Sequence, residues 1–291
     1  MYIRIQGFTM KVFVYGGSGL VGGHLVTELL NGGHEVFAGS RKPETQKATS
    51  NLHWVFADSS ELTKGLEVLE KVDAAYFLSP PGQTNQYEIL SPWIEKAKQV
   101  GLKKLVLMTA MGVDHAPPEA PFRKTEILLE GAGIPWNIIR PNWFMQNFHT
   151  FWIAGIKQDG KIYFPGGSAK TSFIDARDIA SVAAVLLTSS KNDNQAFTLT
   201  GPESIDHNEA ANHLTKVSGK TIGYVDVDPK VFESSLVSAG LTKDYAAFLV
   251  MIAGALKEGF ASPILDTVKT LTGKDPLSFA QYAKDNAGAW K

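Results

Sequence analysis

Short apolar runs alternate along the first half of the chain with longer segments that carry apolar residues at helical spacing. The short runs are rich in β-branched and aromatic residues and end at glycine, proline or polar turns, which is typical of buried strands. The expected strands are KVFVY (11–15), HEVFAGS (34–40), LHWVFAD (52–58), DAAYFLSPPG (73–82), KKLVLMTAMG (103–112) and PWNIIRPN (135–142). Strands that alternate with helices predict an α/β fold whose parallel sheet is doubly wound and covered on both faces.

The segments between these strands predict helices. Residues 20–33 have apolar positions at helical spacing and stop at Gly32 and Gly33, a common helix end. The other expected helices of this half cover residues 61–72, 85–101 and 124–133.

The second half of the chain is less regular. Its expected short strands are GKIYFPGG (160–167), AKTSFIDARD (169–178), QAFTLTGPE (195–203) and IGYVDV (222–227). A strong helical pattern covers residues 176–190, where Asp178 favours the first turn through the helix dipole. Two or three further helices are expected after Ser204.

These patterns divide the chain into a large α/β domain and a smaller, mainly helical C-terminal lobe. The α/β domain is expected over residues 10–150 and 171–200, and the lobe over residues 151–170 and 201–291. Residues 1–9 precede the first strand pattern and do not enter this division.

Composition and charge exclude several function classes. The chain has 291 residues, 44% of them hydrophobic, and a net charge of −1 without a basic stripe, so no nucleic-acid partner is expected. No apolar run reaches the ~18 residues of a membrane helix, so no membrane partner is expected either. Cysteine is absent and the 7 histidines have no metal-binding spacing, which excludes thiolate catalysis and argues against a metal site. We expect a cytoplasmic protein, and the sequence leaves its oligomeric state open.

The glycine-rich stretch VYGGSGLVGGH joins the first expected strand to the first expected helix, with the spacing Gly16-x-x-Gly19-x-x-Gly22. In this context Gly16 permits a tight turn, Gly19 lets a pyrophosphate approach the backbone, and Gly22 lets the helix pack closely. The free N–H groups at the start of the helix then favour phosphates. The residues predicted to hold a dinucleotide here are Gly16, Ser18, Gly19, Leu20, Val21 and Gly22. The alternative is a glycine-rich turn without a ligand.

The end of the second strand indicates which dinucleotide is preferred. An NAD-binding strand usually ends in an acid that accepts from the ribose 2′-hydroxyl, but here Arg41 and Lys42 follow the strand and Glu35 lies at its other end. Two cations suit a 2′-phosphate, so NADP(H) is expected to bind, with NAD(H) bound more weakly. The alternative for both side chains is a solvated loop charge.

Asp58, followed by Ser59, ends the third strand at the position where this fold places an acceptor for the adenine amino group. The sequence DSSEL is also typical of a helix N-cap, so both roles are open.

The segments GGSGLVG, SRKPE and LLEGAGIPWNIIRPNWFMQNF resemble the NmrA-like family of atypical short-chain dehydrogenase/reductases. The likeness continues through IDARDIASVAAVLL and the segments that follow, and covers nearly the whole chain from Met10. The resemblance implies a Rossmann domain that binds NADP(H). Members of the family are reductases of quinones, dyes and related compounds, or NADP(H)-sensing regulators without known turnover.

The resemblance also implies a binding surface at the ends of three further strands. Residues after the fourth strand would flank the ribose and phosphates, those after the fifth the nicotinamide ribose, and those after the sixth the nicotinamide and substrate. The residues concerned are Leu78, Ser79, Pro80, Pro81, Thr109, Ala110, Met111, Pro141, Asn142, Trp143 and Phe144.

One departure from related enzymes bears on catalysis. Typical short-chain dehydrogenases use Tyr-x-x-x-Lys, but none of the 8 tyrosines here heads that motif. Relatives similar to isoflavone reductases carry a lysine where this chain has Phe122, and Lys124 is turned ~200° away on a helix. Lys124 is therefore expected to be a solvated charge. His115 and His149 are expected to be surface histidines, with proton donation near neutral pH as the alternative for each. Thr109 is the candidate for a hydroxyl that hydrogen-bonds a carbonyl or ribose, with a plain strand-end hydroxyl as the alternative.

These observations favour an NADPH-dependent oxidoreductase that transfers hydride to a small aromatic acceptor such as a quinone or dye. The aromatic residues Trp143, Phe144, Phe148, Phe151 and Trp152 are dense for one segment, and a subset could line a pocket for a flat substrate. Trp143 is predicted to position that substrate, with Thr109 as a weak donor. The alternative is a non-catalytic NADP(H) sensor of the NmrA type.

Overall fold

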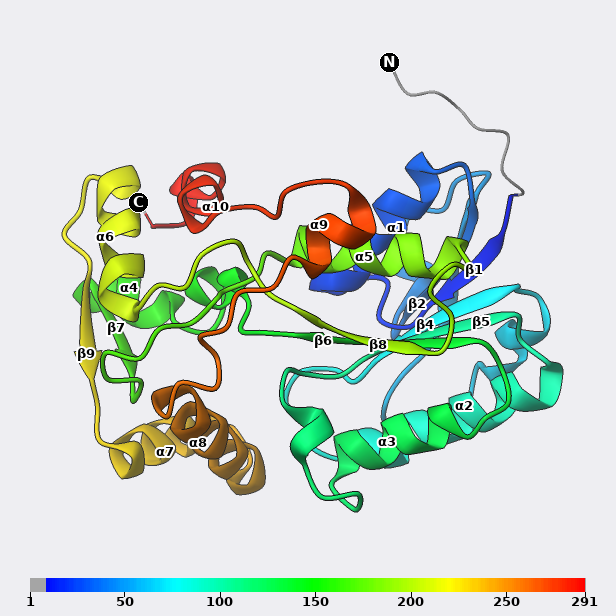
Figure 1. Cartoon of the computed structure of the whole chain (residues 1–291), viewed down its shortest axis with the longest axis horizontal. Helices are drawn as coiled ribbons and strands as arrows, with labels where there is room; N and C mark the ends of the chain where they lie inside the picture. The colour runs from blue at the N-terminus through cyan, green and yellow to red at the C-terminus, as the bar shows by residue number, and fades with distance from the viewer. Residues whose placement is uncertain (1–8, 291) are drawn as a thin grey trace.

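The structure is a computed structural model that describes residues 9–290. Its centre is a parallel sheet of seven strands in the order β3-β2-β1-β4-β5-β6-β8 (Figure 1). The strands are β1 (Lys11–Val14), β2 (Glu35–Ser40), β3 (Leu52–Phe56), β4 (Ala74–Leu78), β5 (Lys104–Met108), β6 (Trp136–Pro141) and β8 (Gln195–Leu199). All seven were predicted, and the chain crosses from β1 to both sides of the sheet. The predicted doubly wound α/β fold is confirmed.

Alternate residues of β1 pack into two separate hydrophobic cores, one on each face of the sheet. Val12 and Val14 pack with α1 (Leu20–Asn31) and α5 (Ala176–Thr188) on one face of the sheet. Phe13 packs on the other face with Trp93, at a ring distance of 5.3 Å. That face is covered by α2 (Gln86–Val100) and α3 (Pro121–Glu130) (Figure 1). Because both faces are buried, the strands read as continuous apolar runs.

The lobe lies beyond the carboxyl ends of β6 and β8 (Figure 1). It contains the two-stranded parallel ribbon of β7 (Lys161–Phe164) and β9 (Gly223–Asp226). Its helices are α4 (Ile153–Asp159), α6 (His207–Ser218), α7 (Pro229–Ser238), α8 (Lys243–Lys257) and α10 (Phe279–Asp285). An aromatic cluster with Phe148, Trp152 and Phe279 at its centre forms the core of this lobe.

Three expectations about the elements are wrong. Residues 61–72 do not form an α-helix, because only a short 3-10 helix, Leu66–Glu70, follows Gly65 with its φ of +91°. Residues 169–178 do not form a strand, since they make only isolated bridges to the rest of the chain. Beyond Ser204 the described residues form the five helices α6 to α10 rather than two or three. The remaining 3-10 helices are Pro43–Thr45, Val113–His115, Met145–His149 and Ala287–Trp290.

Helix α9 (Thr267–Thr272) complicates the predicted division of the chain. Its Val268 is buried in the cluster that α1 and α5 form on the sheet. Part of the range 201–291 therefore packs with the α/β domain. The division into two domains stays a prediction, with α9 as its exception.

Candidate cofactor and substrate site

The turn between β1 and α1 has the geometry that its glycines predict. Gly16 has a φ of +71°, a conformation that side chains disfavour. A Cβ at Gly22 would lie 2.1 Å from the Gly16 carbonyl oxygen, so no side chain fits where the helix crosses the turn. A Cβ at Gly19 would meet only that same oxygen, at 3.1 Å, and the space beyond it is open. The loop is therefore closed behind Gly22 and open in front of Gly19.

The first turn of α1 is prepared for an anion. Gly19 is the N-cap, and among residues 9–290 no side chain caps this helix or places an acid in its first turn. The backbone N–H groups at the start of a helix need acceptors, and they attract negative charge. The residues present thus fit a dinucleotide pyrophosphate at Gly19, Leu20 and Val21.

Two buried hydroxyls, of residues that follow β1 and β4, also lack partners. Ser79, just after β4, and Tyr15, just after β1, each have a hydroxyl without a hydrogen-bond partner among the described residues. Burial, with a smaller effect from Asp58, raises the pKa of Tyr15 to about 12. Leu78 lies 3.7 Å from the position of a Cβ at Gly16, so the ends of β1 and β4 are in contact. Buried polar groups are normally paired, and these two are candidates for ligand contacts.

The side chains that follow β2 and β3 are placed as the sequence predicted. Arg41 and Lys42 are exposed after the end of β2, where the Lys42 N–H donates to Ser40 Oγ at 3.1 Å. Asp58 accepts from the Ser60 N–H at 2.9 Å, but no α-helix follows. The N-cap alternative for Asp58 is therefore wrong, and its role toward adenine, with Ser59, stays a prediction.

The ends of β5 and β6 run side by side. The Thr109 N–H donates to the Ile139 carbonyl oxygen at 2.9 Å, and the Met111 N–H donates to that of Pro141 at 3.0 Å. These bonds bring Thr109, Ala110 and Met111 alongside Pro141, as the predicted surface requires.

The Thr109 hydroxyl is engaged by a residue that sequence reasoning missed. Its Oγ1 donates to Glu126 Oε1 of α3 at 2.6 Å, and Glu126 is fully buried. Arg140 of β6 binds the same carboxylate through Nε at 2.9 Å and Nη2 at 2.8 Å. Burial would lower the pKa of Arg140, but its bonds to Glu126 outweigh this and raise it. Two features of the sequence could have revealed this pair: an acid on the apolar face of α3 and an arginine inside the apolar strand β6.

Asn142 and Trp143 link the end of β6 to the lobe. The Asn142 amide Nδ2 donates to Ser172 Oγ and to the Ala261 carbonyl oxygen, each at 2.8 Å, and its Oδ1 accepts from the Trp143 N–H at 2.9 Å. These bonds engage both polar groups of the Asn142 side chain. A contact between Asn142 and the cofactor stays a prediction, and it would be made by the backbone of Asn142. The Trp143 ring stacks on Trp152 at 6.4 Å and so belongs partly to the core of the lobe.

A family model described as NAD(P)H-binding matches residues 16–190. The chain belongs to this family. Membership confirms the predicted class of cofactor, while the preference for NADP(H) over NAD(H) stays a prediction.

Relatives of this NAD(P)H-binding protein cover almost its whole length. It is 29% identical to an uncharacterized oxidoreductase, YesF, of Bacillus subtilis over 282 residues, 96% of each chain. It is 27% identical to an NAD(P)H azoreductase of Xenophilus azovorans over 288 residues, 96% of this chain and 99% of that protein. The NADPH complex of an NADPH-dependent quinone oxidoreductase from Escherichia coli shares the fold, with a TM-score of 0.81 at 20% identity, covering 94% of this chain and 99% of the other.

The titratable side chains Lys124, His115 and His149 each have different surroundings. Lys124 is exposed and lies 3.9 Å from the centre of the Tyr87 ring, in agreement with a solvated helix charge. The His115 side chain is 85% exposed, as expected. His149 differs from the expected surface histidine, because its Nδ1 lies 2.8 Å from the Tyr282 hydroxyl inside the lobe. Burial lowers the pKa of His149.

Aromatic rings from both parts of the chain meet near the start of α3. Phe122 stacks on Phe248 of α8 at 6.1 Å with the ring planes 4° apart, and Phe248 in turn stacks on Tyr245 at 6.2 Å. Of the aromatic segment after β6, Phe148 and Trp152 are buried in the lobe and Phe144 packs on the sheet. Phe122 thus joins an aromatic contact between α3 and α8.

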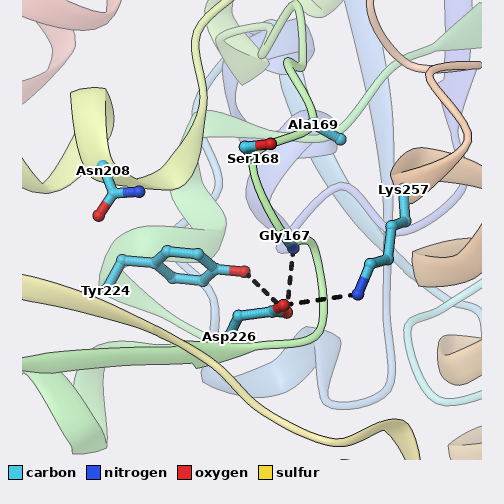
Figure 2. A pocket seen from close by; sticks show the side chains of 7 residues that line it. All are labelled: Gly167, Ser168, Ala169, Asn208, Tyr224, Asp226 and Lys257. Atoms are coloured by element: carbon cyan, nitrogen blue, oxygen red, sulfur yellow. Dashed lines mark hydrogen bonds and ion pairs between the residues drawn. The ribbon is translucent and has the colours of Figure 1, made fainter.

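A separate polar pocket opens in the lobe, and Figure 2 shows its lining. The Asp226 carboxylate at its centre accepts from the Gly167 N–H at 3.0 Å and from the Tyr224 hydroxyl at 3.3 Å, and pairs with Lys257 at 3.4 Å. None of the residues predicted to hold the cofactor lines it. Its two charged side chains, Asp226 and Lys257, are paired with each other, and the pocket adds nothing to the cofactor site.

Residues 9–290 offer neither a metal-binding cluster nor a membrane-spanning helix. No group of three or more histidine or acidic side chains is arranged to hold a metal ion. No helix within this range is both long enough and apolar enough to cross a membrane. The cytoplasmic location stays a prediction.

Proposed function

We propose that this protein is an NADPH-dependent oxidoreductase that reduces a small aromatic acceptor, such as a quinone or a dye, by hydride transfer. The observation that carries the proposal is the turn between β1 and α1, where an uncapped helix start faces the open space in front of Gly19. The nicotinamide supplies the hydride when the cofactor is bound, and the protein binds, orients and excludes water.

The preference for NADPH rests on the end of β2. Arg41 and Lys42 are both exposed there, and neither Ser40 nor Gly39 is an acid that would select a free 2′-hydroxyl. A guanidinium and an ammonium form charge-assisted hydrogen bonds to a phosphate. We therefore assign the 2′-phosphate to Arg41 and Lys42 and the pyrophosphate to the start of α1.

The proposed class of hydride acceptor rests on the absence of a Tyr-x-x-x-Lys pair from the sequence and on the names of the relatives. An electron-poor quinone or cationic dye takes hydride without a strong protein acid, and this sequence has no Tyr-x-x-x-Lys pair. The relatives include proteins named NAD(P)H azoreductase and NADPH-dependent quinone oxidoreductase. Phe122 of α3 stacks on Phe248 of α8, and the Trp143 ring after β6 stacks on Trp152; aromatic rings of this kind suit a flat apolar substrate.

Steady-state oxidation of NADPH against a panel of quinones and azo and cationic dyes tests the proposal. Saturable turnover of at least one acceptor supports it, with NADPH giving a higher kcat/KM than NADH. A non-catalytic NADP(H) sensor is the second candidate, favoured by the engagement of the Thr109 hydroxyl with Glu126. NADPH and NADP⁺ bound with different affinities, without turnover of any acceptor, would establish the sensor instead.

A further inference from the structure

We propose that the buried Glu126 carboxylate fixes the Thr109 hydroxyl as a hydrogen-bond acceptor for the nicotinamide end of the cofactor. Thr109 then serves cofactor binding, and it does not donate to the acceptor substrate. The inference rests on the proposed function, because it needs NADP(H) at the carboxyl ends of β4 and β5. Glu126 acts through Thr109 and is a positioning residue.

The first step is the saturation of the carboxylate. Oε1 of Glu126 accepts from Thr109 Oγ1 at 2.6 Å and from Arg140 Nε at 2.9 Å. Oε2 accepts from Arg140 Nη2 and from Arg123 Nη1, each at 2.8 Å. A carboxylate offers about four lone-pair positions, and here four donors occupy them. Glu126 is therefore neither a free base nor a proton store.

The second step is the polarity of the hydroxyl. A carboxylate between two guanidinium groups can only accept, so the single hydroxyl proton of Thr109 must point at Glu126. Turning that proton toward a ligand would leave a buried lone pair of Glu126 unpaired, which is unfavourable. The Thr109 oxygen thus presents lone pairs and no proton to anything that binds beside it.

The third step matches this polarity to a ligand. The nicotinamide nucleoside carries donors, namely the ribose hydroxyls and the carboxamide N–H groups. A quinone oxygen or an azo nitrogen is an acceptor and gains nothing from the lone pairs of Thr109. The cofactor is therefore the better partner, and protons for the acceptor must come from elsewhere, including solvent.

The network also fixes where Thr109 stands. Arg140 also reaches Asp114 of the 3-10 helix Val113–His115 through Nη1 at 3.4 Å. Thr109, Arg140 and Glu126 are all less than 10% exposed, so water does not compete for these bonds. The ends of β5 and β6 and the start of α3 are held as one unit around the hydroxyl.

Calorimetric titration of NADP⁺ tests the inference apart from turnover. Thr109→Val should weaken NADP⁺ binding about tenfold, the size of one lost hydrogen bond. Thr109→Ser, which keeps the hydroxyl, should bind within about twofold of the wild type on the same scale. At saturating NADPH, the loss of quinone reduction in Thr109→Val should be much smaller than its loss of affinity. A loss that falls on kcat while affinity stays unchanged would show donation to the substrate and overturn the inference.

A double-mutant cycle tests the role of Glu126. The oxygen of the Glu126→Gln amide should face Arg140 Nη2 and Arg123 Nη1, which turns its NH₂ toward Thr109 and Arg140 Nε and occupies the lone pairs of Thr109. NADP⁺ binding should then weaken about as much as in Thr109→Val, and the double variant should lose little more. Additive losses would show that Glu126 does not act through Thr109.

The matched control is Glu130→Gln, which removes the other carboxylate on Arg123 at the exposed side of α3 and should leave NADP⁺ affinity unchanged. If Glu126→Gln does not fold, the Thr109 pair still decides the inference. A wild-type protein that binds no NADP⁺ would overturn the proposed function itself, whereas wild-type binding that Thr109→Val leaves intact would overturn only the inference.

Discussion

His207 is fully buried, and among residues 9–290 neither of its ring nitrogens has a hydrogen-bond partner. Rings of Phe164, Tyr224 and Trp152 surround it at 4.8, 5.1 and 5.3 Å. Burial lowers the pKa of His207 to about 3, and the charge of Asp226 opposes this only weakly. At the scale of one residue, the lobe therefore contains a histidine whose ring must be neutral in the folded protein.

The stability of the protein should therefore fall in acid through His207. The unfolded chain takes up the proton near pH 6.5 while the folded chain does not, so the stabilisation is present above that pH and is lost as pH falls toward 3. About 2 kcal/mol should be lost between roughly pH 6.5 and pH 5. Chemical denaturation of wild type and His207→Phe over this range measures the effect as a difference between the two proteins.

The comparison of variants is needed because Asp178 acts in the opposite direction. Burial raises the pKa of Asp178 to about 6, so its contribution to stability increases as pH falls through that value. Asp178 is present in both proteins and cancels. Parallel pH dependences for wild type and His207→Phe would contradict the role of the histidine.

Arg41 carries the cofactor preference at the same scale. Arg41→Ala should cost roughly 1.5–3 kcal/mol of NADPH affinity, the size of a charge-assisted hydrogen bond. NADH affinity should barely change, because NADH has no 2′-phosphate. Fluorescence titration with both cofactors measures this, and equal losses would show that Arg41 does not contact the 2′-phosphate.

At the scale of elements, local signals predicted well and long-range ones did not. The glycine spacing placed the turn, the start of α1 and the end of β1, because the conformation of Gly16 and the fit of Gly22 are decided within a few residues. Gly65 was read as part of a helix, but a Cβ there would lie 2.3 Å from the Phe56 carbonyl oxygen. That clash depends on β3, which no local pattern around Gly65 reveals.

The glycine turn gives a prediction that separates binding from folding. Gly19→Val should abolish NADPH binding while the melting temperature stays close to that of the wild type, because the side chain enters the open space in front of the turn. Gly22→Ala is the contrasting variant, since its Cβ would sit 2.1 Å from the Gly16 carbonyl oxygen and should destabilise the fold. Fluorescence titration beside a thermal melt checks both, and NADPH binding retained by Gly19→Val would refute the assignment of the loop.

At the scale of the whole molecule, buried hydrogen bonds join segments that are distant in the sequence. Asn142 at the end of β6 binds the Ala261 carbonyl oxygen, 119 residues away, and the buried Asp178 accepts from the Leu277 N–H, 99 residues away. Helix α9 returns to the sheet between these two contacts. The sequence predicted the ends of β1, β2, β4, β5 and β6, but it could not predict such pairings, because neither partner carries a pattern that names the other. The Glu126–Arg140 pair was missed for the same reason.

Trp143 follows the end of β6, where the chain enters the lobe, and its variants test whether substrate positioning dominates catalysis. Its carbonyl oxygen accepts from the Ile174 N–H at 2.9 Å, and its ring packs on Trp152 and Phe164 of the lobe. Misplacing an acceptor by ~1 Å can cost about a hundredfold in rate. Trp143→Ala should therefore reduce kcat/KM for a quinone or dye by at least about tenfold, roughly 1.4 kcal/mol.

A thermal melt must accompany the Trp143 measurement, because the ring is also part of the core of the lobe, and Trp143→Phe should recover much of both stability and rate.

Lys124→Ala, His115→Ala and His149→Ala should each change kcat/KM by less than about fivefold, roughly 1 kcal/mol. The reason is that Lys124 and His115 are exposed and His149 is bonded to Tyr282, so none is held against the ends of β5 and β6. A loss of about a thousandfold in any of these three variants would reveal general acid catalysis on its usual scale. Hydride transfer to the quinone or dye would then depend on a titrating side chain, and the aromatic rings around Trp143 would be less important.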